Sequence, residues 1–407
     1  MTDLSVSVVV VSRGRPAALR RCLTGLGQLY YPRFEVIVVA DPQGLSAITD
    51  WSGQIKTVGF DEANISAARN LGIAQAAGDI VAFIDDDAVP EPTWLDYLAA
   101  AFASPDVSAA GGFVRGRNGI SFQWKARVAQ SDATTRDLPV DEQQVTIHQN
   151  APGRAAKTEG TNMAVRRDIL ARMGGFDPAF RFYLDETDLN LRLGMAETRT
   201  AFVPLAQVHH GFAASARRRD DRVPLSLFEI GASHAAFLRR HGAGLDALAL
   251  RDAERAAQRA RLLRHMVAGR LEPRDVGRLL DGFDSGWIDG AARPMEALPE
   301  IGVAETDFLP MTVRTGRGHR VMSGRRRDRK ALLQEAEQAV AAGERITLVI
   351  LSHTARRHRV QFTDGGVWLQ SGGQFGASNR DENSFRLWRF DDRVHQEISN
   401  LSHLRKI

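Results

Sequence analysis

The hydrophobic residues in the first ninety positions fall into short β-branched runs separated by stretches with helical spacing. Apolar runs cover residues 4–12, 34–41 and 80–85, and each is typical of a strand buried on both faces. A helix is expected between the first two runs, and another is predicted to begin at Ile65 with Asn64 as its cap. Alternating strands and helices predict βαβ units with right-handed crossovers. The pattern therefore predicts a doubly wound α/β domain with a mostly parallel sheet and helices on both faces.

The pattern continues with further elements up to about residue 240. Residues 130–156 are polar without a clear period, and we expect them to form a loop. The other predicted elements are a helix over 94–102, a strand near Val114, a strand running into a helix over 161–170, a helix beginning near Asp185 or Glu186, and a strand over 200–210 followed by a loop.

From Pro224 the spacing becomes that of amphipathic helices, one of them rich in Arg. Residues 324–330 are expected to be a basic linker or a helix start. A helix over 331–344, a strand over 345–351 and a β-hairpin over 358–373 follow. The chain is thus predicted to contain an α/β domain at 1–240, a helical extension at 241–320 and a small α+β region of unassigned role at 321–407.

The composition is that of an ordinary soluble protein. Of the 407 residues, 43% are hydrophobic and 25% are charged, and no apolar run approaches the ~20 residues needed to span a bilayer. The formal net charge of +4 does not argue for a nucleic-acid partner. Cys22 is the single cysteine, which favours a reducing compartment. Residues 4–11 lack a basic leader and a cleavage site, so we expect a cytoplasmic location.

The Arg-rich helix of the C-terminal part raises a second hypothesis about location. It could lie on an anionic membrane, which would place the protein peripherally at the inner face of the cell membrane. The alternative is a solvated helix that packs on the first domain.

Three aspartates follow the third strand. In an extended segment Asp85 and Asp87 share a face and Asp86 points the other way. Two carboxylates on one side suit Mg²⁺, which takes one or two protein carboxylates together with phosphate oxygens. Asp41 ends a neighbouring strand, and the carboxyl ends of parallel strands form the ligand-binding edge. The alternatives are a solvated acidic turn before Pro90 and, for Asp41, a cap or turn residue.

Three arginines lie close to this predicted edge. Arg13 and Arg15 follow the first strand, and Arg69 lies on the helix that begins at Ile65. They could supply charge to a diphosphate, although each by itself is more often a surface arginine.

A second acidic group lies at a predicted helix start. Asp185, Glu186 and Asp188 could provide a general base, or could simply suit the positive end of the helix dipole. Asp188 and Arg192 are four residues apart and are predicted to form an intrahelical ion pair, which leaves Asp185 and Glu186 for catalysis.

Adjacent histidines end the strand predicted over 200–210. His209 or His210 could add a neutral nitrogen ligand to a metal held by the aspartates, although such a pair is more often structural. No further His or Cys lies nearby at zinc spacing.

Together these segments resemble family 2 of the glycosyltransferases, the inverting enzymes of GT-A fold, over about residues 4 to 240. The likeness lies in "VSVVVVSRGRP", "VIVVAD", "NISAARNLGIAQAAGDIVAFIDDDAVP", "EGTNMAVRRDILARMGGFDPAF", "YLDETDLNLRL" and "VHHGFAAS", which occur in the family's order. The acids of "YLDETDLNLRL" are swapped relative to the family's usual Glu-Asp, so the resemblance implies Glu186 as the base with Asp185 as the alternative.

The resemblance also implies roles for other residues. They are nucleotide-sugar binding by Ser12, Arg13, Arg15, Asp41, Arg69, Asn70, Asp85 and Asp86; metal ligation by Asp87 with His210, or with His209; and an acceptor side at Gly160, Thr161 and Asn162. Residues 215–222 could close over the diphosphate as a lid, or form a solvated basic loop.

The activity implied by this resemblance is transfer of a sugar from a nucleoside-diphosphate sugar to a hydroxyl of a carbohydrate or lipid-linked acceptor. The expected cofactor is Mn²⁺ or Mg²⁺, and the expected setting is synthesis of cell-surface polysaccharide or glycoconjugate. Two alternatives stay open, a non-catalytic protein that binds sugar nucleotides or polysaccharide, and a sugar nucleotidyltransferase.

Overall fold

The computed structural model describes the chain except for residues 1–2, 212–216, 218 and 313–317. Its centre is a 10-stranded sheet. Eight of the strands lie in the order β10-β13-β6-β12-β4-β1-β2-β3, and the other two, β5 and β7, pair with β13 and β6. The strands are β1 (Val6–Ser12), β2 (Phe34–Ala40), β3 (Lys56–Gly59), β4 (Ile80–Asp85), β5 (Ala88–Pro90), β6 (Val107–Arg115), β7 (Phe122–Trp124), β10 (Thr146–Gln149), β12 (Met163–Arg166) and β13 (Arg199–His210).

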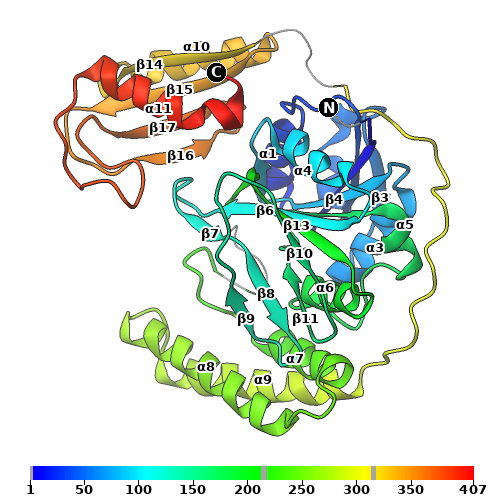
Figure 1. Cartoon of the computed structure of the whole chain (residues 1–407). Helices are drawn as coiled ribbons and strands as arrows, with labels where there is room; N and C mark the ends of the chain where they lie inside the picture. The colour runs from blue at the N-terminus through cyan, green and yellow to red at the C-terminus, as the bar shows by residue number, and fades with distance from the viewer. Residues whose placement is uncertain (1–2, 212–216, 218, 313–317) are drawn as a thin grey trace.

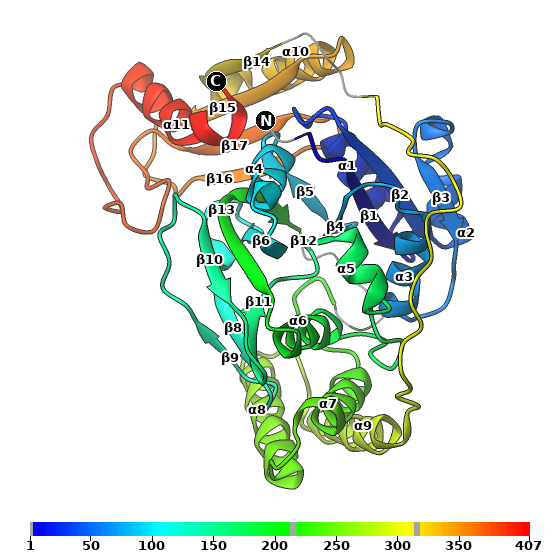
Figure 2. The same ribbon diagram turned by 45° about the vertical axis from the view of Figure 1, so that its right-hand side comes forward.

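Two layers of helices cover this sheet (Figures 1 and 2). On one face α1 (Pro16–Leu26) and α4 (Trp94–Ala100) pack on Val8 and Val10 of β1. On the other face Val9 lies in a separate core with α3 (Ile65–Gln75), α5 (Arg167–Arg172) and α6 (Asp185–Met195). Successive residues of β1 therefore enter different cores, which is why the strand is apolar at nearly every position.

The predicted α/β class is confirmed. The strands β4, β1, β2 and β3 are parallel to one another, and β6 is parallel to β13. The strand β12 lies between β4 and β6 and runs antiparallel to both. Asn64 caps α3 as predicted, its Oδ1 accepting from the backbone N–H of Ala67 at 3.1 Å. The short elements α2 (Pro42–Ser46) and β3 were not predicted, because four or five residues carry too little periodicity.

The expectation of a loop over 130–156 is wrong. A separate three-stranded sheet with the order β11-β8-β9 lies here, and β10 joins the edge of the main sheet. Its strands are β8 (Arg127–Gln130), β9 (Thr135–Asp137) and β11 (Arg154–Lys157). Each has only three or four residues, and β9 is exposed throughout, so pairing rather than an apolar pattern defines these strands.

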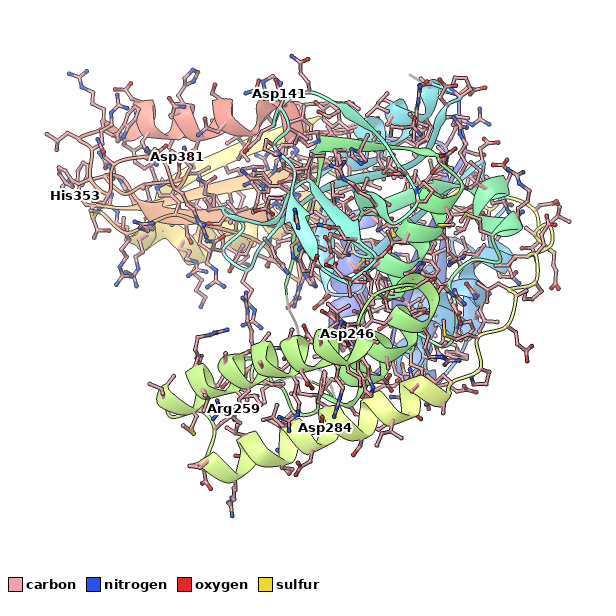
Figure 3. All side chains as sticks on the ribbon, turned by 60° about the horizontal axis from the view of Figure 1, so that its bottom comes forward. Asp141, Asp246, Arg259, Asp284, His353 and Asp381 are labelled. Atoms are coloured by element: carbon pink, nitrogen blue, oxygen red, sulfur yellow. The ribbon has the colours of Figure 1, made fainter. Side chains whose placement is uncertain are left out.

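The two amphipathic helices expected after Pro224 are α7 (Phe228–His241) and α8 (Ala247–Val267), and a third helix, α9 (Pro273–Ala292), follows that was not predicted individually. Figure 3 shows α8 and α9 side by side, where Asp284 of α9 pairs with Arg251 and Arg255 of α8 at 2.8 and 2.9 Å. The predicted helical extension ends at Ala292, however. Residues 293–312 run past the first domain without helix or strand (Figure 1), held by bonds such as Ile301 N–H to the Ala171 carbonyl.

The C-terminal region forms a second α/β layer structure. Its four-stranded sheet has the order β14-β15-β17-β16, in which β14, β15 and β17 are parallel and β16 and β17 form the predicted antiparallel hairpin. The bounds are β14 (His319–Arg325), α10 (Arg329–Ala341), β15 (Arg345–Ser352), β16 (Arg359–Phe362), β17 (Trp368–Gly373) and α11 (Phe390–Arg405). The strand β14 was not predicted, and its end takes up part of the expected basic linker.

Within the described residues, none of the helices combines the length and the apolar character that a bilayer crossing requires.

Candidate active site

The acidic triplet lies where β4 leaves the sheet. Asp85 is the last residue of β4 and lies beside Val11 of β1. Carboxylate oxygens of Asp85 and Asp87 and a ring nitrogen of His210 lie within 4.8 Å of one another. His210 Nε2 is 3.3 Å from Asp87 Oδ1 and 3.9 Å from Asp85 Oδ2. The structure thus brings three predicted residues, from two separate strand ends, into one candidate metal centre.

The second nitrogen of His210 decides which atom faces this centre. Nδ1 lies 3.2 Å from Gln123 Oε1, an oxygen that accepts, so Nδ1 is bonded there and Nε2 is the nitrogen that faces the aspartates. The ring also packs against Trp124, with 5.9 Å between the ring centres. Two carboxylate oxygens and one imidazole nitrogen fit a divalent cation such as Mn²⁺, which accepts both oxygen and nitrogen ligands.

The structure corrects the prediction that His209 is an alternative metal ligand. His209 Nε2 lies 2.8 Å from Oε1 of Glu91, a fully buried carboxylate at the end of β5. Adjacent residues of a strand point to opposite sides, so only one of the two histidines can reach the aspartates. His210 is that residue.

Asp86 is fully buried and lies in the turn after β4, so the alternation expected of a strand does not separate it from Asp87: one Arg15 guanidinium contacts both, and its second nitrogen lies 3.4 Å from Asp87 Oδ2. Ser12 Oγ donates to Asp86 Oδ2 at 2.6 Å, and an Arg15 nitrogen lies 2.6 Å from Asp86 Oδ1. Burial raises the pKa of Asp86 to about 7, with Asp87 and Asp85 adding to the rise and Arg15 opposing it. Ser12 and Arg15 therefore hold Asp86, the middle residue of the triplet, from inside the domain.

Two other residues that were predicted to bind the nucleotide sugar, Asp41 and Arg13, also have partners within the chain. Asp41 is the N-cap of α2, where its Oδ1 accepts from the Gly44 N–H at 2.9 Å. Its Oδ2 accepts from the N–H of Gly14, a residue whose positive φ of 67° glycine adopts without strain. Arg13 pairs with Asp61 at 2.9 Å on the surface.

The predicted acid pair opens α6, which begins at Asp185 as expected. Asp185 is almost fully buried and forms an ion pair with Arg69. A second nitrogen of Arg69 lies 3.5 Å from Asp85, so one guanidinium links the acid pair to the metal centre. Gly160 packs against this guanidinium, and a Cβ there would come within 2.4 Å of it. A side chain at position 160 would therefore displace Arg69.

Glu186 has a different environment from Asp185. Its side chain is 19% exposed, compared with 5% for Asp185, and Lys157 Nζ lies 2.6 Å from its Oε1. Lys157 is also 3.3 Å from Glu159, which in turn pairs with Arg127. None of these three was predicted. They lie just outside the stretch 130–156 that was expected to be a loop, and the four-residue strands β8 and β11 are too short to show a pattern.

The two acids are pushed apart in pKa. Burial raises the pKa of Asp185 to about 8, opposed by Arg69 and increased by the neighbouring Glu186. Burial acts in the same direction on Glu186, but Lys157, together with Arg69 and Asp185, outweighs it and lowers the pKa of Glu186 to about 2. The more exposed acid, Glu186, is therefore ionised at neutral pH.

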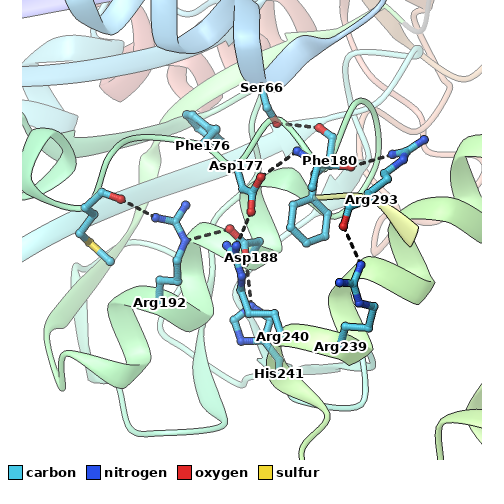
Figure 4. A network of polar contacts seen from close by, with 12 residues as sticks. Ser66, Phe176, Asp177, Phe180, Asp188, Arg192, Arg239, Arg240, His241 and Arg293 are labelled. Atoms are coloured by element: carbon cyan, nitrogen blue, oxygen red, sulfur yellow. Dashed lines mark hydrogen bonds and ion pairs between the residues drawn. The ribbon is translucent and has the colours of Figure 1, made fainter. Parts of the chain in front are cut away.

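Asp188 follows the acid pair in α6 and is fully buried. Figure 4 shows the polar network around it. Its predicted ion pair with Arg192 is confirmed at 2.8 Å, and Arg240 and His241 of α7 add contacts at 3.1 and 2.9 Å. These partners lower the pKa of Asp188 to about 2 against the effect of burial. This network fixes the start of α6 against α7.

The remaining predicted residues are engaged inside the fold. Asn162 Nδ2 donates to the carbonyls of Phe113 and Ala206, and its Oδ1 accepts from Trp94. Thr161 is buried beside it. Asn70 exchanges two hydrogen bonds with the backbone of Phe176, at 2.7 and 2.8 Å. Asn70 and Asn162 therefore hold backbone segments in place, and both ends of their amides are occupied.

The predicted lid lies in part outside the described residues, which omit Ser215, Ala216 and Arg218. Of the rest, Arg217 stacks on Phe182 at 4.4 Å.

This constellation belongs to a known class of protein. The sequence profile of the glycosyltransferase like family 2 matches residues 4–222, so the chain belongs to this family. The α/β fold and the acidic end of β4 agree with the GT-A fold that the resemblance implied.

Individual relatives are distant. The chain is 27% identical over 241 residues to the O-antigen biosynthesis protein RfbC of Myxococcus xanthus, which covers 54% of this chain and 18% of the relative. It is 26% identical over 219 residues to the probable glycosyltransferase YdaM of Bacillus subtilis, covering 49% of each. It is 29% identical over 214 residues to the pre-mycofactocin glycosyltransferase of Mycobacterium tuberculosis, covering 50% and 42%. The matches therefore span less than half the length of each of these relatives.

Among solved structures, the mannosyltransferase PcManGT of Pyrobaculum calidifontis, in complex with GDP-Man and Mn²⁺, is similar with a TM-score of 0.44 at 18% identity. That likeness covers 71% of this chain and 88% of the other.

Proposed function

We propose that this protein is a metal-dependent inverting glycosyltransferase that moves a sugar from a nucleoside-diphosphate sugar to an acceptor hydroxyl. The observation that carries the proposal is the convergence of the cluster Asp85, Asp87 and His210 with a pair of acids through Arg69. A protein that only binds sugar nucleotides needs no such acid pair. Family membership agrees with this proposal. The setting we propose is synthesis of cell-surface polysaccharide or glycoconjugate.

In the proposed reaction an acceptor oxygen forms a bond to the anomeric carbon while the bond from that carbon to the diphosphate breaks. Attack from the opposite face inverts the configuration, and no covalent intermediate with the protein forms. Asp85, Asp87 and His210 would hold Mn²⁺ or Mg²⁺, which supplies positive charge against the diphosphate. Arg69 holds Asp85 and Asp185 in a fixed relation, which keeps the donor and acceptor sides aligned.

The proposed base is Glu186, which accepts the proton of the acceptor hydroxyl. Glu186 is ionised at neutral pH because Lys157 lowers its pKa, and it is the more exposed of the two acids. Burial raises the pKa of Asp185, and its side chain is tied to Arg69 by an ion pair. In this reading Asp185 is a positioning residue.

The metal role is tested with Asp87→Asn, which keeps the size of the side chain and removes its charge. We expect transfer to fall below detection in assays of nucleoside diphosphate release with a panel of nucleotide sugars and Mn²⁺, while the melting temperature stays within a few degrees. Asp106→Asn is the matched control, because Asp106 pairs with Arg199 on the surface. Transfer that persists in Asp87→Asn or with a chelator would exclude the metal role, and release of pyrophosphate would indicate a nucleotidyltransferase instead.

The base is tested by comparing Glu186→Gln with Asp185→Asn. Glu186→Gln should lower kcat about 10²- to 10⁴-fold and keep donor binding, because general base catalysis contributes about that factor. Were Asp185 the base, wild-type activity would instead rise as the pH passes through about 8, and Glu186→Gln would stay active.

A further inference from the structure

The C-terminal region, residues 319–407, lies outside the segment matched by the family profile and has no assigned role. It packs against the first domain at the end of β13, the strand that carries His210 (Figure 2). Two separate sets of contacts reach the residues on either side of His210. These contacts connect the C-terminal region to the candidate metal centre.

The first set starts at Arg405, near the end of the chain. Its guanidinium is fully buried and donates to both oxygens of Glu91, at 2.8 and 2.9 Å, across a sequence separation of 314 residues. The same Glu91 carboxylate lies 2.8 Å from His209, the residue before His210. Trp368 of β17 packs on both partners, with its ring 4.3 Å from the Arg405 guanidinium carbon and 4.9 Å from the His209 ring.

The charges in this first set depend on each other. Glu91 is fully buried, which by itself raises its pKa, yet Arg405 and His209 hold the pKa well below its usual range. Removing Arg405 would therefore leave a buried carboxylate whose main counter-charge is lost. β5 pairs directly with β13, Ala88 opposite His210 and Val89 opposite His209, so any movement of Glu91 is passed to the metal ligand.

The second set reaches the other side of His210. Val360 of β16 donates its N–H to the Asn118 carbonyl at 2.8 Å, in the turn that joins β6 to β7. In the same turn Arg117 Nε donates to the Gly211 carbonyl at 3.0 Å, and the Gly211 N–H donates to the Asp87 carbonyl at 2.8 Å.

The turn and β16 meet closely. Gly119 has a φ of 67°, and a Cβ there would come within 2.1 Å of the Val360 carbonyl oxygen, so the contact requires a glycine. The C-terminal region thus reaches the segment that follows His210 as well as the segment that precedes it.

We propose that the C-terminal region holds His210 in its ligating position, and that Arg405 is the positioning residue that acts through Glu91 and His209. This inference rests on the proposed metal role of Asp85, Asp87 and His210. It makes the C-terminal region a part of the catalytic unit rather than an independent binding module. Groups that orient a metal ligand in this way typically change metal affinity about 10- to 100-fold when they are removed.

The test is Mn²⁺ affinity, which does not depend on transfer activity. Mn²⁺ is titrated into the full chain by calorimetry, with and without UDP or GDP, for wild type, Arg405→Met and Arg117→Ala. We expect the Kd for Mn²⁺ to rise about tenfold or more in both variants. Lys406→Met is the matched control, because the adjacent Lys406 pairs with Asp96 at the surface, and its Kd should equal that of wild type.

Circular dichroism and thermal unfolding show whether each variant is folded. Gly119→Ala, titrated in the same way, pushes the turn away from β16 without touching Arg405, and its Kd decides the question if Arg405→Met does not fold. Folded variants that keep the wild-type Kd would overturn the inference and leave the proposed function standing. A wild-type protein that binds no Mn²⁺ under any of these conditions would instead refute the metal role, and the inference with it.

Discussion

The contact between Lys157 and Glu186 gives the sharpest test of the acid–base chemistry. Lys157→Met removes the charge 2.6 Å from the Glu186 carboxylate and keeps an apolar chain of similar length. Lys157, with smaller effects of Arg69 and Asp185, lowers the pKa of Glu186 from an ordinary 4.5 to about 2, against burial. At about 1.36 kcal/mol per unit, the ionised form of Glu186 gains roughly 3 kcal/mol in the folded protein.

The sign of the effect follows from linkage. Because the folded pKa of Glu186 is depressed, its stabilising contribution is present above about pH 4.5 and is lost as the pH falls toward about 2. Burial is the largest single influence on this pKa, so without Lys157 we expect it to exceed the lowering effects of Arg69 and Asp185 and to raise the pKa of Glu186 above 4.5. A larger fraction of the base is then protonated in mildly acidic buffer, so activity should fall there.

The assay is the pH dependence of kcat, measured by nucleoside diphosphate release at saturating substrate. Wild-type activity should show no acid limb from Glu186 above about pH 4, whereas in Lys157→Met an acid limb should appear at about pH 5 or higher. Lys125→Met is the control, because Lys125 pairs with Glu142 on the surface, and its profile should match wild type. If folded Lys157→Met keeps the wild-type acid limb, the assignment of Glu186 as the base is refuted.

Other predictions concern packing and the interface between the two α/β units. Gly112→Ala should unfold the protein or lower its melting temperature by many degrees, because a Cβ on β6 would lie 1.8 Å from the Ala206 carbonyl oxygen. Gly277 lies on α9, and a Cβ added there would meet nothing within 4 Å. Gly277→Ala should therefore be neutral or stabilise the protein by about 0.4–1 kcal/mol. Equal melting temperatures for the two variants would contradict the packing argument. Burial lowers the pKa of His319 to about 3, so the folded protein should lose stability as the pH falls from about 6.5 toward 3. The free energy of unfolding, measured with urea at several pH values in this range, should depend less steeply on pH in His319→Gln.

Part of this protein could be predicted from the sequence alone. Strands buried on both faces must be apolar at every position, so β1, β2 and β4 stand out as runs, and the sharp change to aspartate marks the end of β4. The start of α6 and the ion pair between Asp188 and Arg192 follow from helical spacing. These features depend on residues close together in the chain.

Only the tertiary structure decided which groups meet across long separations. It selected His210 over His209, because β5 presents Glu91 to one side of β13 and the acidic triplet lies on the other. It paired Glu186 with Lys157, from a strand too short to show a period.

The structure also brought Arg405 to Glu91, which no local pattern can indicate. Sequence periodicity reports how much of each side chain is buried, whereas the pairing of charges depends on where separate elements cross. The residue types around the candidate metal centre were therefore readable from the sequence. Their partners, and with them the pKa values that set the chemistry, were decided by the packing of strands and helices far apart in the chain.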